Sequence, residues 1–147
     1  MFKHLLVPTD GSTLSMDTAR RAVAFARETG ARISFFFAQP EYPVAFYGEG
    51  ALIDPTTPER FAEIAEKQAQ EVLDQCRSLA AGAGVACDGV TSVSDVPYQA
   101  IIDAASAAGC DLIFMASHGR RGITGLLLGS ETQKVLTHST IPVLVYR

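Results

Sequence analysis

The sequence predicts one α/β domain over residues 1–147, built on a mostly parallel sheet with helices on both faces. Short apolar runs alternate along the chain with segments whose apolar residues recur at helical spacing. One run, Leu112–Ala116, is apolar throughout, which is typical of a parallel strand covered on both faces. The length of 147 residues fits one ordinary domain with one core.

The first part of the chain predicts two strands with a helix between them. His4–Pro8 is a short apolar run closed by a turn, and we expect a buried strand there. Ser12 is a good N-cap for the helix that follows, and Gly30 ends that helix as a C-terminal glycine commonly does. Ala31–Gln39 is rich in Ile and Phe and predicts the second strand.

A long connection, Pro40–Pro58, follows the second strand. It holds four prolines and two glycines and is too long for a plain turn, so it is either a functional lid or a mobile loop. Its aromatic residues either close over a base or cover part of the core; they are Tyr42, Phe46 and Tyr47.

The second part of the chain predicts three more strands, again alternating with helices. Thr57 and Pro58 open the longest helix, and Gly82 and Gly84 stop it. The inward face of this helix is expected to hold Phe61, Ala65, Ala69, Val72, Cys76 and Leu79. Val85–Val93 predicts a more polar strand near an edge of the sheet. A helix is expected to start in Ser94–Pro97 and to bury Ile101, Ala104, Ala105 and Ala108. The remaining elements are the strand Leu112–Ala116, a short helix Ser130–His138 and a last strand Ile141–Tyr146.

The composition argues against several classes of function. The net charge is −4 and there is no basic run, whereas nucleic-acid binding needs clustered Lys and Arg side chains. No apolar stretch approaches membrane length and none at the N-terminus suits a signal peptide, so we expect no membrane association and a cytoplasmic location. Three cysteines fit neither a metal site nor a closed disulfide framework, and we expect reduced, buried thiols at Cys76, Cys87 and Cys110.

Two loops of the predicted sheet are the candidate ligand site. In open parallel sheets, ligands bind beyond the carboxyl ends of the strands, where the strand order reverses. The segment Pro8–Ser12 follows the first strand, and Ala116–Ser130 follows the fourth. We therefore expect these two loops to meet around a ligand.

The second of these loops has the chemistry of a phosphate cradle. Four glycines fall within eleven residues, and glycine allows both a positive φ and a close approach of the backbone to a ligand. The helix starting after Gly129 offers free N–H groups and a favourable dipole to an anion, with Ser130 and Thr132 as further donors and Arg120 or Arg121 to offset charge. The lysine-containing P-loop pattern is absent. The alternative is that the glycines only shape a turn and Ser130 is an ordinary N-cap.

The spacing in this loop resembles that of the universal stress protein family. In that family the ATP-binding loop follows the fourth strand as Gly, two residues, Gly, nine residues, Gly and then Ser or Thr. This chain has Ala116, Gly119, Gly129 and Ser130 at these positions, so the spacing matches and only the first glycine is replaced.

The resemblance extends over essentially the whole chain, from Phe2 to Arg147. The opening segment Val7–Ser12 and the closing segment Ile141–Val145 are similar to those of the family. The likeness implies an open parallel five-stranded sheet in the order 3-2-1-4-5, of the adenine nucleotide α-hydrolase-like type. It also implies a homodimer, in which the last strand pairs antiparallel with its copy, because an exposed apolar edge is a liability unless it is paired.

The resemblance further implies where ATP and Mg²⁺ bind. Ala38 matches the position whose backbone meets adenine, and Asp10 matches an aspartate at the nucleotide, where a carboxylate can carry a magnesium ion that bridges phosphates. The residues expected at the nucleotide are Pro8, Thr9, Asp10, Ser12, Ala38, Met115, Ala116, Ser117, His118, Gly119, Arg120, Gly122, Gly129, Ser130, Glu131 and Thr132.

Three of these residues have a second interpretation. Asp10 is also suited to stabilising its own turn or the start of the first helix. His118 is either a contact to ribose or phosphate or a structural polar group, because no partnered base or nucleophile is visible. The methyl group of Ala116 crowds the ligand or forbids a positive φ, unless the residue has ordinary β geometry.

The expected function is ATP binding in a stress response, with the nucleotide as a regulatory ligand. Hydrolysis needs a positioned water and charge stabilisation, and no general base is assigned, so any ATPase activity is expected to be slow. Two alternatives remain from the sequence. One is a dimeric interaction module without nucleotide, favoured if Ala116 blocks the pocket. The other is an adenine-nucleotide-dependent enzyme acting on a phosphate ester or an adenylate.

Overall fold

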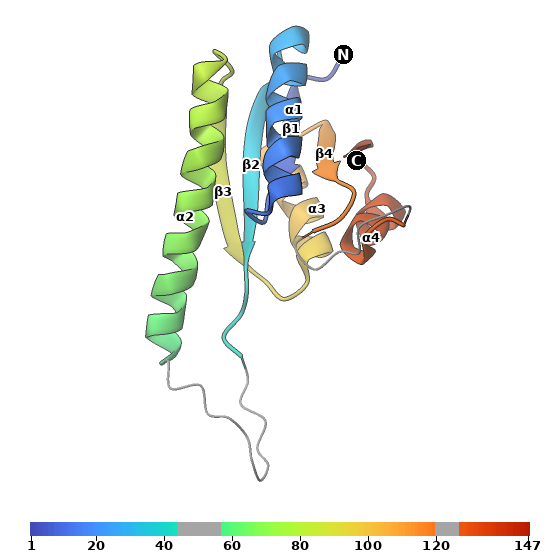
Figure 1. The fold of residues 1–147 in the computed structure, drawn as a ribbon. Coiled ribbons are helices and arrows are strands. Elements are labelled where there is room, and N and C mark those ends of the chain that lie inside the picture. The colour runs from blue at the N-terminus through green and yellow to red at the C-terminus, as the bar shows by residue number, and fades with distance from the viewer. Residues whose placement is uncertain (44–56, 120–126) are drawn as a thin grey trace.

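The computed structural model describes residues 1–43, 57–119 and 127–147 (Figure 1). In these parts of the chain, five strands form one parallel sheet in the order β3-β2-β1-β4-β5, which confirms the predicted fold class and strand order. The strands are β1 (His4–Pro8), β2 (Arg32–Gln39), β3 (Cys87–Val93), β4 (Leu112–Ala116) and β5 (Val143–Tyr146).

Three strands begin later than the sequence analysis expected. Strand β2 begins at Arg32 instead of Ala31, and β3 begins at Cys87 instead of Val85. Strand β5 begins at Val143 instead of Ile141, because Pro142 has no N–H group and joins the sheet only by accepting from Ile113 N–H at 2.9 Å. The prediction that β3 lies near an edge is confirmed, since it ends the strand order.

Two helices cover each face of the sheet. They are α1 (Thr13–Thr29), α2 (Pro58–Gly82), α3 (Pro97–Ala108) and α4 (Ser130–His138). Helices α1 and α2 pack on the face that carries Leu5, Val7, Ile33 and Phe35, whereas α3 and α4 pack on the face that carries Leu6, Phe36, Ile113 and Met115. Apolar side chains alternate between the two faces along β1 and β2, as the two-residue period of a strand requires.

The helix ends follow the predicted capping chemistry. The Ser12 hydroxyl accepts a hydrogen bond from Ser15 N–H at 3.2 Å at the start of α1, and Gly30 ends that helix with φ 75°. Thr57 caps α2 in the same way by accepting from Arg60 N–H at 3.2 Å. The inward face of α2 includes two residues that the sequence analysis missed, Leu73 and Ala80, while Phe61 and Leu79 are only partly buried.

The described cysteines are free thiols. Cys76 and Cys110 are buried and Cys87 is half-buried. Burial raises the pKa of Cys76 and of Cys110 to about 11, so both stay protonated at neutral pH and are poor nucleophiles. No helix in the described residues is long and apolar enough to cross a membrane.

A buried histidine lies at the end of the sheet opposite the candidate site. His4 is 9% exposed, and its Nε2 lies 2.8 Å from the hydroxyl of fully buried Ser34. The backbone N–H of His4 donates to the carboxylate of Asp111 at 3.0 Å, which ties the start of β1 to the start of β4. Burial, assisted by the positive charge of Arg32, lowers the pKa of His4 below its ordinary value, against the weaker opposing effects of Asp88 and Asp111.

We expect this histidine to make the fold less stable in mild acid. The unfolded chain takes up a proton at His4 near pH 6.5, about its ordinary pKa, while the folded chain does so only at lower pH. The unfolded state therefore binds more protons as the pH falls below about 7, and the free energy of unfolding should decrease. Urea unfolding at a series of pH values from about 7.5 to 5 measures this slope.

A pair of variants assigns the slope to one residue. His4→Gln keeps a polar partner for Ser34 but does not titrate, so its unfolding free energy should change less over this range. His138→Gln, at an exposed histidine at the end of α4, is the matched control for the loss of a histidine side chain. Equal slopes for the wild type and His4→Gln would contradict the prediction.

Candidate functional site

A cleft of about 880 Å³ lies at the carboxyl ends of β1, β2 and β4. Strand β1 has β2 on one side and β4 on the other, so the cleft opens where the strand order reverses. The two loops that the sequence analysis selected both contribute to it. Its walls include these predicted residues: Pro8, Thr9, Asp10, Ala38, Met115, Ala116, His118, Gly119, Gly129, Ser130, Glu131 and Thr132.

Four predicted residues are not on the described walls of the cleft. Ser12 and Ser117 are next to lining residues of the cleft in the sequence. Ser12 caps α1, and Ser117 is buried directly after β4. Arg120 and Gly122 lie outside the described residues, as do Arg121, Phe46 and Tyr47. Tyr42 is described, and its ring meets the ring of Phe61 edge-on at 5.5 Å.

The loop after β1 is held by its own side chains. Asp10 Oδ1 accepts from Ser12 N–H at 2.9 Å, which is the turn-stabilising role expected as an alternative. A Cβ on Gly119 would lie only 3.0 Å from Asp10 Oδ2, so the second carboxylate oxygen faces the loop after β4. The two loops therefore meet at Asp10.

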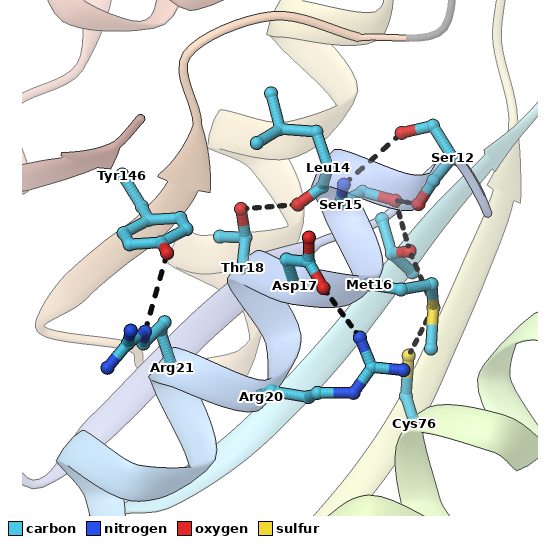
Figure 2. Close-up of polar contacts among 11 residues, drawn as sticks. Ser12, Leu14, Ser15, Met16, Asp17, Thr18, Arg20, Arg21, Cys76 and Tyr146 are labelled. Atoms are coloured by element: carbon cyan, nitrogen blue, oxygen red, sulfur yellow. Dashed lines mark hydrogen bonds and ion pairs between the residues drawn. The ribbon is translucent and has the colours of Figure 1, made fainter.

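Thr9 anchors this loop to the first turn of α1. Its backbone N–H donates to the carbonyl of Phe36 at 2.8 Å, and its hydroxyl lies 3.1 Å from that of Ser15. The Ser15 hydroxyl in turn donates to the carbonyl of Ser12 at 3.0 Å, and Figure 2 shows Ser12, Ser15 and Met16 together on this turn. The turn is thus bonded both to the sheet and to the helix, and the loop has a defined shape before any ligand arrives.

Strand β2 extends beyond the end of β1 and leaves a peptide group facing the cleft. The last pair between the two strands is Pro8 with Phe36, and the carbonyl of Phe36 accepts from Thr9 N–H. Backbone groups of successive residues in a strand point to opposite sides. Phe37 therefore points to β3, where its carbonyl accepts from Thr91, and the N–H and C=O of Ala38 point toward the cleft beyond the end of β1.

The loop after β4 is closed by a contact between its two ends. Gly129 N–H donates to the carbonyl of Ser117 at 2.8 Å, and a Cβ on Gly129 would lie 3.0 Å from the Cα of His118. The φ of Gly129 is −62°, and the φ of Gly119 is also outside the left-handed region. Neither glycine therefore uses the positive φ that this residue type allows. Glycine at position 129 avoids the tight contact that a side chain would make with His118.

Ala116 has ordinary strand geometry. It is the last residue of β4, pairs with Tyr146 of β5, and no described residue other than glycine has a positive φ. The alanine that replaces the first glycine of the loop pattern is therefore accommodated without backbone strain.

The N-terminus of α4 opens onto the cleft. Gly129 is its N-cap and makes no side-chain bond, and among the described residues none accepts a hydrogen bond from the N–H of Ser130 or Glu131. Thr132 is different, because its buried hydroxyl donates to the carbonyl of Ala116 at 3.0 Å and joins the helix to β4. The anion-binding groups here are backbone amides, reinforced by the helix dipole.

Glu131 is directed toward α3, although it lies on the wall of the cleft. Its carboxylate accepts from Tyr98 N–H at 2.8 Å and pairs with Lys134 at 3.2 Å. Helix α3 has Val96 as its N-cap and no cap bond from that side chain, so Glu131 supplies the missing acceptor from a neighbouring helix.

The described walls of the cleft are acidic. They carry the carboxylates of Asp10, Asp95 and Glu131, and among the described lining residues there is no Lys or Arg. His118 is also on the wall, with its Nδ1 3.2 Å from the hydroxyl of Ser117. An anionic ligand would thus be met by backbone N–H groups and would need a cation to offset the carboxylates.

A magnesium ion bound through phosphates fits this donor set. No group of three His, Cys, Asp or Glu side chains that could hold a metal occurs in the described parts of the chain. Mg²⁺ often takes only one or two carboxylates and completes its shell with phosphate oxygens and water. Asp10, which faces the loop after β4, is the carboxylate best placed to do this.

Part of the wall was not predicted from the sequence. Ser94 and Asp95 directly follow β3, so the rule that parallel strands end at one edge was a usable signal for them. Phe36 was recognised only as part of a strand, and Ile101 only as a buried helix residue. The full set of missed residues is Ser15, Phe36, Pro40, Ser94, Asp95, Pro97, Ile101, Leu127, Leu128 and Gln133.

Sequence comparisons give one consistent result. A model of the universal stress protein family matches residues 1–147. The chain is 33% identical over 148 residues to a universal stress protein of Thermus aquaticus and 30% identical over 151 residues to universal stress protein YxiE of Bacillus subtilis. Both alignments cover 100% of this chain and 100% of the relative.

Solved structures share the fold. A universal stress protein in complex with cAMP superposes with a TM-score of 0.71 at 24% identity, covering 99% of this chain and 97% of that one. A universal stress protein family protein of Arabidopsis thaliana with AMP bound gives a TM-score of 0.68 at 16% identity, covering 97% and 90%. At these identities the likeness establishes the common fold.

Proposed function

Because the chain belongs to the universal stress protein family, we propose that residues 1–147 act as one cytoplasmic ATP-binding domain whose nucleotide is a regulatory ligand in a stress response. One observation carries the proposal. The peptide group of Ala38, beyond the end of β1, and the N-terminus of α4 open onto the same cleft, one suited to a base and the other to phosphates. The fold neighbours solved with cAMP and with AMP support an adenine nucleotide as the ligand.

Adenine would be recognised by the main chain of β2. Its Watson–Crick edge presents a donor, the N6 amino group, beside an acceptor, N1. The C=O and N–H of Ala38 are the complementary pair, and β1 does not reach them. Phe36 and Ile101 supply apolar wall beside this position, where a base excludes water.

The phosphates would lie at the other end of the cleft, against the N–H groups of Ser130 and Glu131. The helix dipole favours negative charge there, and Gly119 and Gly129 bring the backbone close. Asp10 would hold Mg²⁺, and the ion would offset both the phosphates and the nearby carboxylates. The Thr132 hydroxyl is committed to Ala116, so its role in this site is to position the helix.

Base identity tests the proposal directly. We expect ATP to bind at least about 30-fold more tightly than GTP, because guanine presents O6 and N1–H where adenine presents N6–H and N1, and both bonds to Ala38 would be mismatched. Isothermal titration calorimetry in the presence of Mg²⁺ measures both affinities. Chromatography of small molecules released from the purified protein provides an independent check.

ITP is the matched control for this titration. It has the O6 and N1–H edge of GTP without the 2-amino group, so it should bind as weakly as GTP. Equal affinities for ATP and ITP would show that the edge of the base is not read and would contradict the proposed role of Ala38.

We propose that ATP hydrolysis is slow at most. Asp10 bonds Ser12 N–H, Glu131 caps α3, and His118 lies beside Ser117, so these three side chains of the cleft already have structural partners. Slow turnover suits a ligand that reports on nucleotide supply. The nucleotide-free interaction module loses its main support, since Ala116 has ordinary β geometry.

We also propose a homodimer formed through β5. In the described parts of the chain no strand pairs with the outer edge of β5, whose residues are only half-buried. Pairing with a second copy would satisfy its backbone groups.

A further inference from the structure

The last strand of the sheet is bonded to the start of the loop after β4. Ser117 N–H donates to the carbonyl of Tyr146 at 2.8 Å, one residue beyond the pairing of Ala116 with Tyr146. Ser117 is therefore held in strand-like alignment although β4 has ended. Tyr146 is the penultimate residue of the chain.

From Ser117 the backbone bonds continue to α4. The carbonyl of Ser117 accepts from Gly129 N–H at 2.8 Å, and the carbonyl of Gly129 accepts from Gln133 N–H at 3.0 Å in the first turn of α4. A displacement of Ser117 would thus move Gly129 and the amides of the helix N-terminus with it.

The side chain of Tyr146 fixes the end of β5 against α1. Figure 2 shows the Tyr146 ring beside Arg21, whose Nε lies 3.4 Å from the Tyr146 hydroxyl. The guanidinium carbon is 5.8 Å from the ring centroid, and the ring packs against the core under α1 and α2. Within the described residues β5 pairs only with β4, and this side chain adds a second contact that holds the end of the strand.

We infer that Tyr146 is a positioning residue for the phosphate-binding end of the cleft. The inference rests on the proposed function, because it assigns Tyr146 to the loop that would hold the phosphates. Tyr146 does not line the cleft and would not touch the nucleotide. It acts through Ser117 and Gly129, so its loss should weaken binding of the phosphates and leave binding of the base unchanged.

Titration with ATP and with adenosine separates these two effects. For Tyr146→Ala we expect ATP to bind roughly 3- to 10-fold more weakly, the equivalent of about one lost hydrogen bond, with adenosine affinity unchanged. Tyr146→Phe keeps the ring against Arg21 and should restore ATP affinity. Val93→Ala, at the exposed end of the opposite edge strand, is the matched control and should change neither affinity.

Amide hydrogen exchange tests the positioning without any nucleotide. The N–H groups of Ser117 and Gly129 should exchange faster in Tyr146→Ala than in wild type and Tyr146→Phe. Unchanged exchange at both amides would overturn the inference, as would an equal weakening of ATP and adenosine. A wild type that binds neither ligand would refute the proposed function, whereas faster exchange in Tyr146→Ala would still support the coupling of β5 to the loop.

Discussion

A Gly129→Val variant is expected to bind MgATP roughly 10- to 100-fold more weakly than wild type, because a side chain at this position overpacks the loop. A Cβ at position 129 would lie 3.0 Å from the Cα and 3.1 Å from the Cβ of His118. The neighbours include backbone and cannot simply rotate away. We expect the contact between Ser117 and Gly129 to open and the N-terminus of α4 to move out of line with the cleft.

The free energy of unfolding of Gly129→Val should fall by less than its free energy of MgATP binding. Gly129 makes no side-chain cap bond, so valine removes none, and the strain is confined to a loop outside the two cores. Calorimetric titration measures the affinity, and thermal unfolding measures the stability.

Gly82→Val is the matched control. Gly82 is the last residue of α2, its φ is not in the left-handed region, and a Cβ there meets nothing within 4 Å. This variant should bind MgATP as the wild type does. If Gly129→Val bound equally well, the cradle formed by this loop would have to be abandoned.

Replacing either of two adjacent phenylalanines by alanine should destabilise the fold strongly, but only one replacement should alter nucleotide binding. Phe35 and Phe36 are 0% and 1% exposed and point to opposite faces of β2. Each substitution should lower the free energy of unfolding by about 3–5 kcal/mol through lost burial and the cavity left behind. Only Phe36 lines the cleft, beside the peptide group of Ala38.

The pair separates packing from recognition because the two variants are matched in residue type, strand and burial. Phe36→Ala should weaken both adenosine and ATP by a similar factor, and Phe35→Ala should leave both affinities near wild type when corrected for the folded fraction. Phe35→Leu and Phe36→Leu repeat the comparison at lower cost in stability if the alanine variants are largely unfolded. Equal losses of affinity in Phe35→Ala and Phe36→Ala would contradict a specific role of Phe36 and indicate that either variant distorts β2 as a whole.

The fold was predictable because each element carries a local signal. Alternating apolar runs and helical periodicity gave the strands and helices, and the caps at Ser12 and Gly30 were readable from residue type. The exact boundaries of the strands were less predictable. Pro142 lies in an apolar run, but its missing N–H keeps it out of β5, and Val85 is buried without being part of β3.

The site was predictable to the level of its loops but not of its individual contacts. The carboxyl-end rule selected both loops, and spacing selected Gly129. That Gly129 is needed for its contact with His118, and not for a positive φ, depends on how the loop closes on itself. The orientation of Glu131 likewise depends on α3, which lies over twenty residues earlier in the chain and lacks a side-chain cap of its own.

The mismatch in length between β1 and β2 has an evolutionary implication. The groups proposed to read the base at position 38 belong to the main chain, and every residue except proline supplies the same pair of them. Mutations there can change the side chain without altering what the base meets, provided that the new side chain fits the wall. The preference for adenine can therefore persist while residue types at position 38 diverge. Among relatives, the feature to compare is whether β2 extends beyond β1, not which residue stands at position 38.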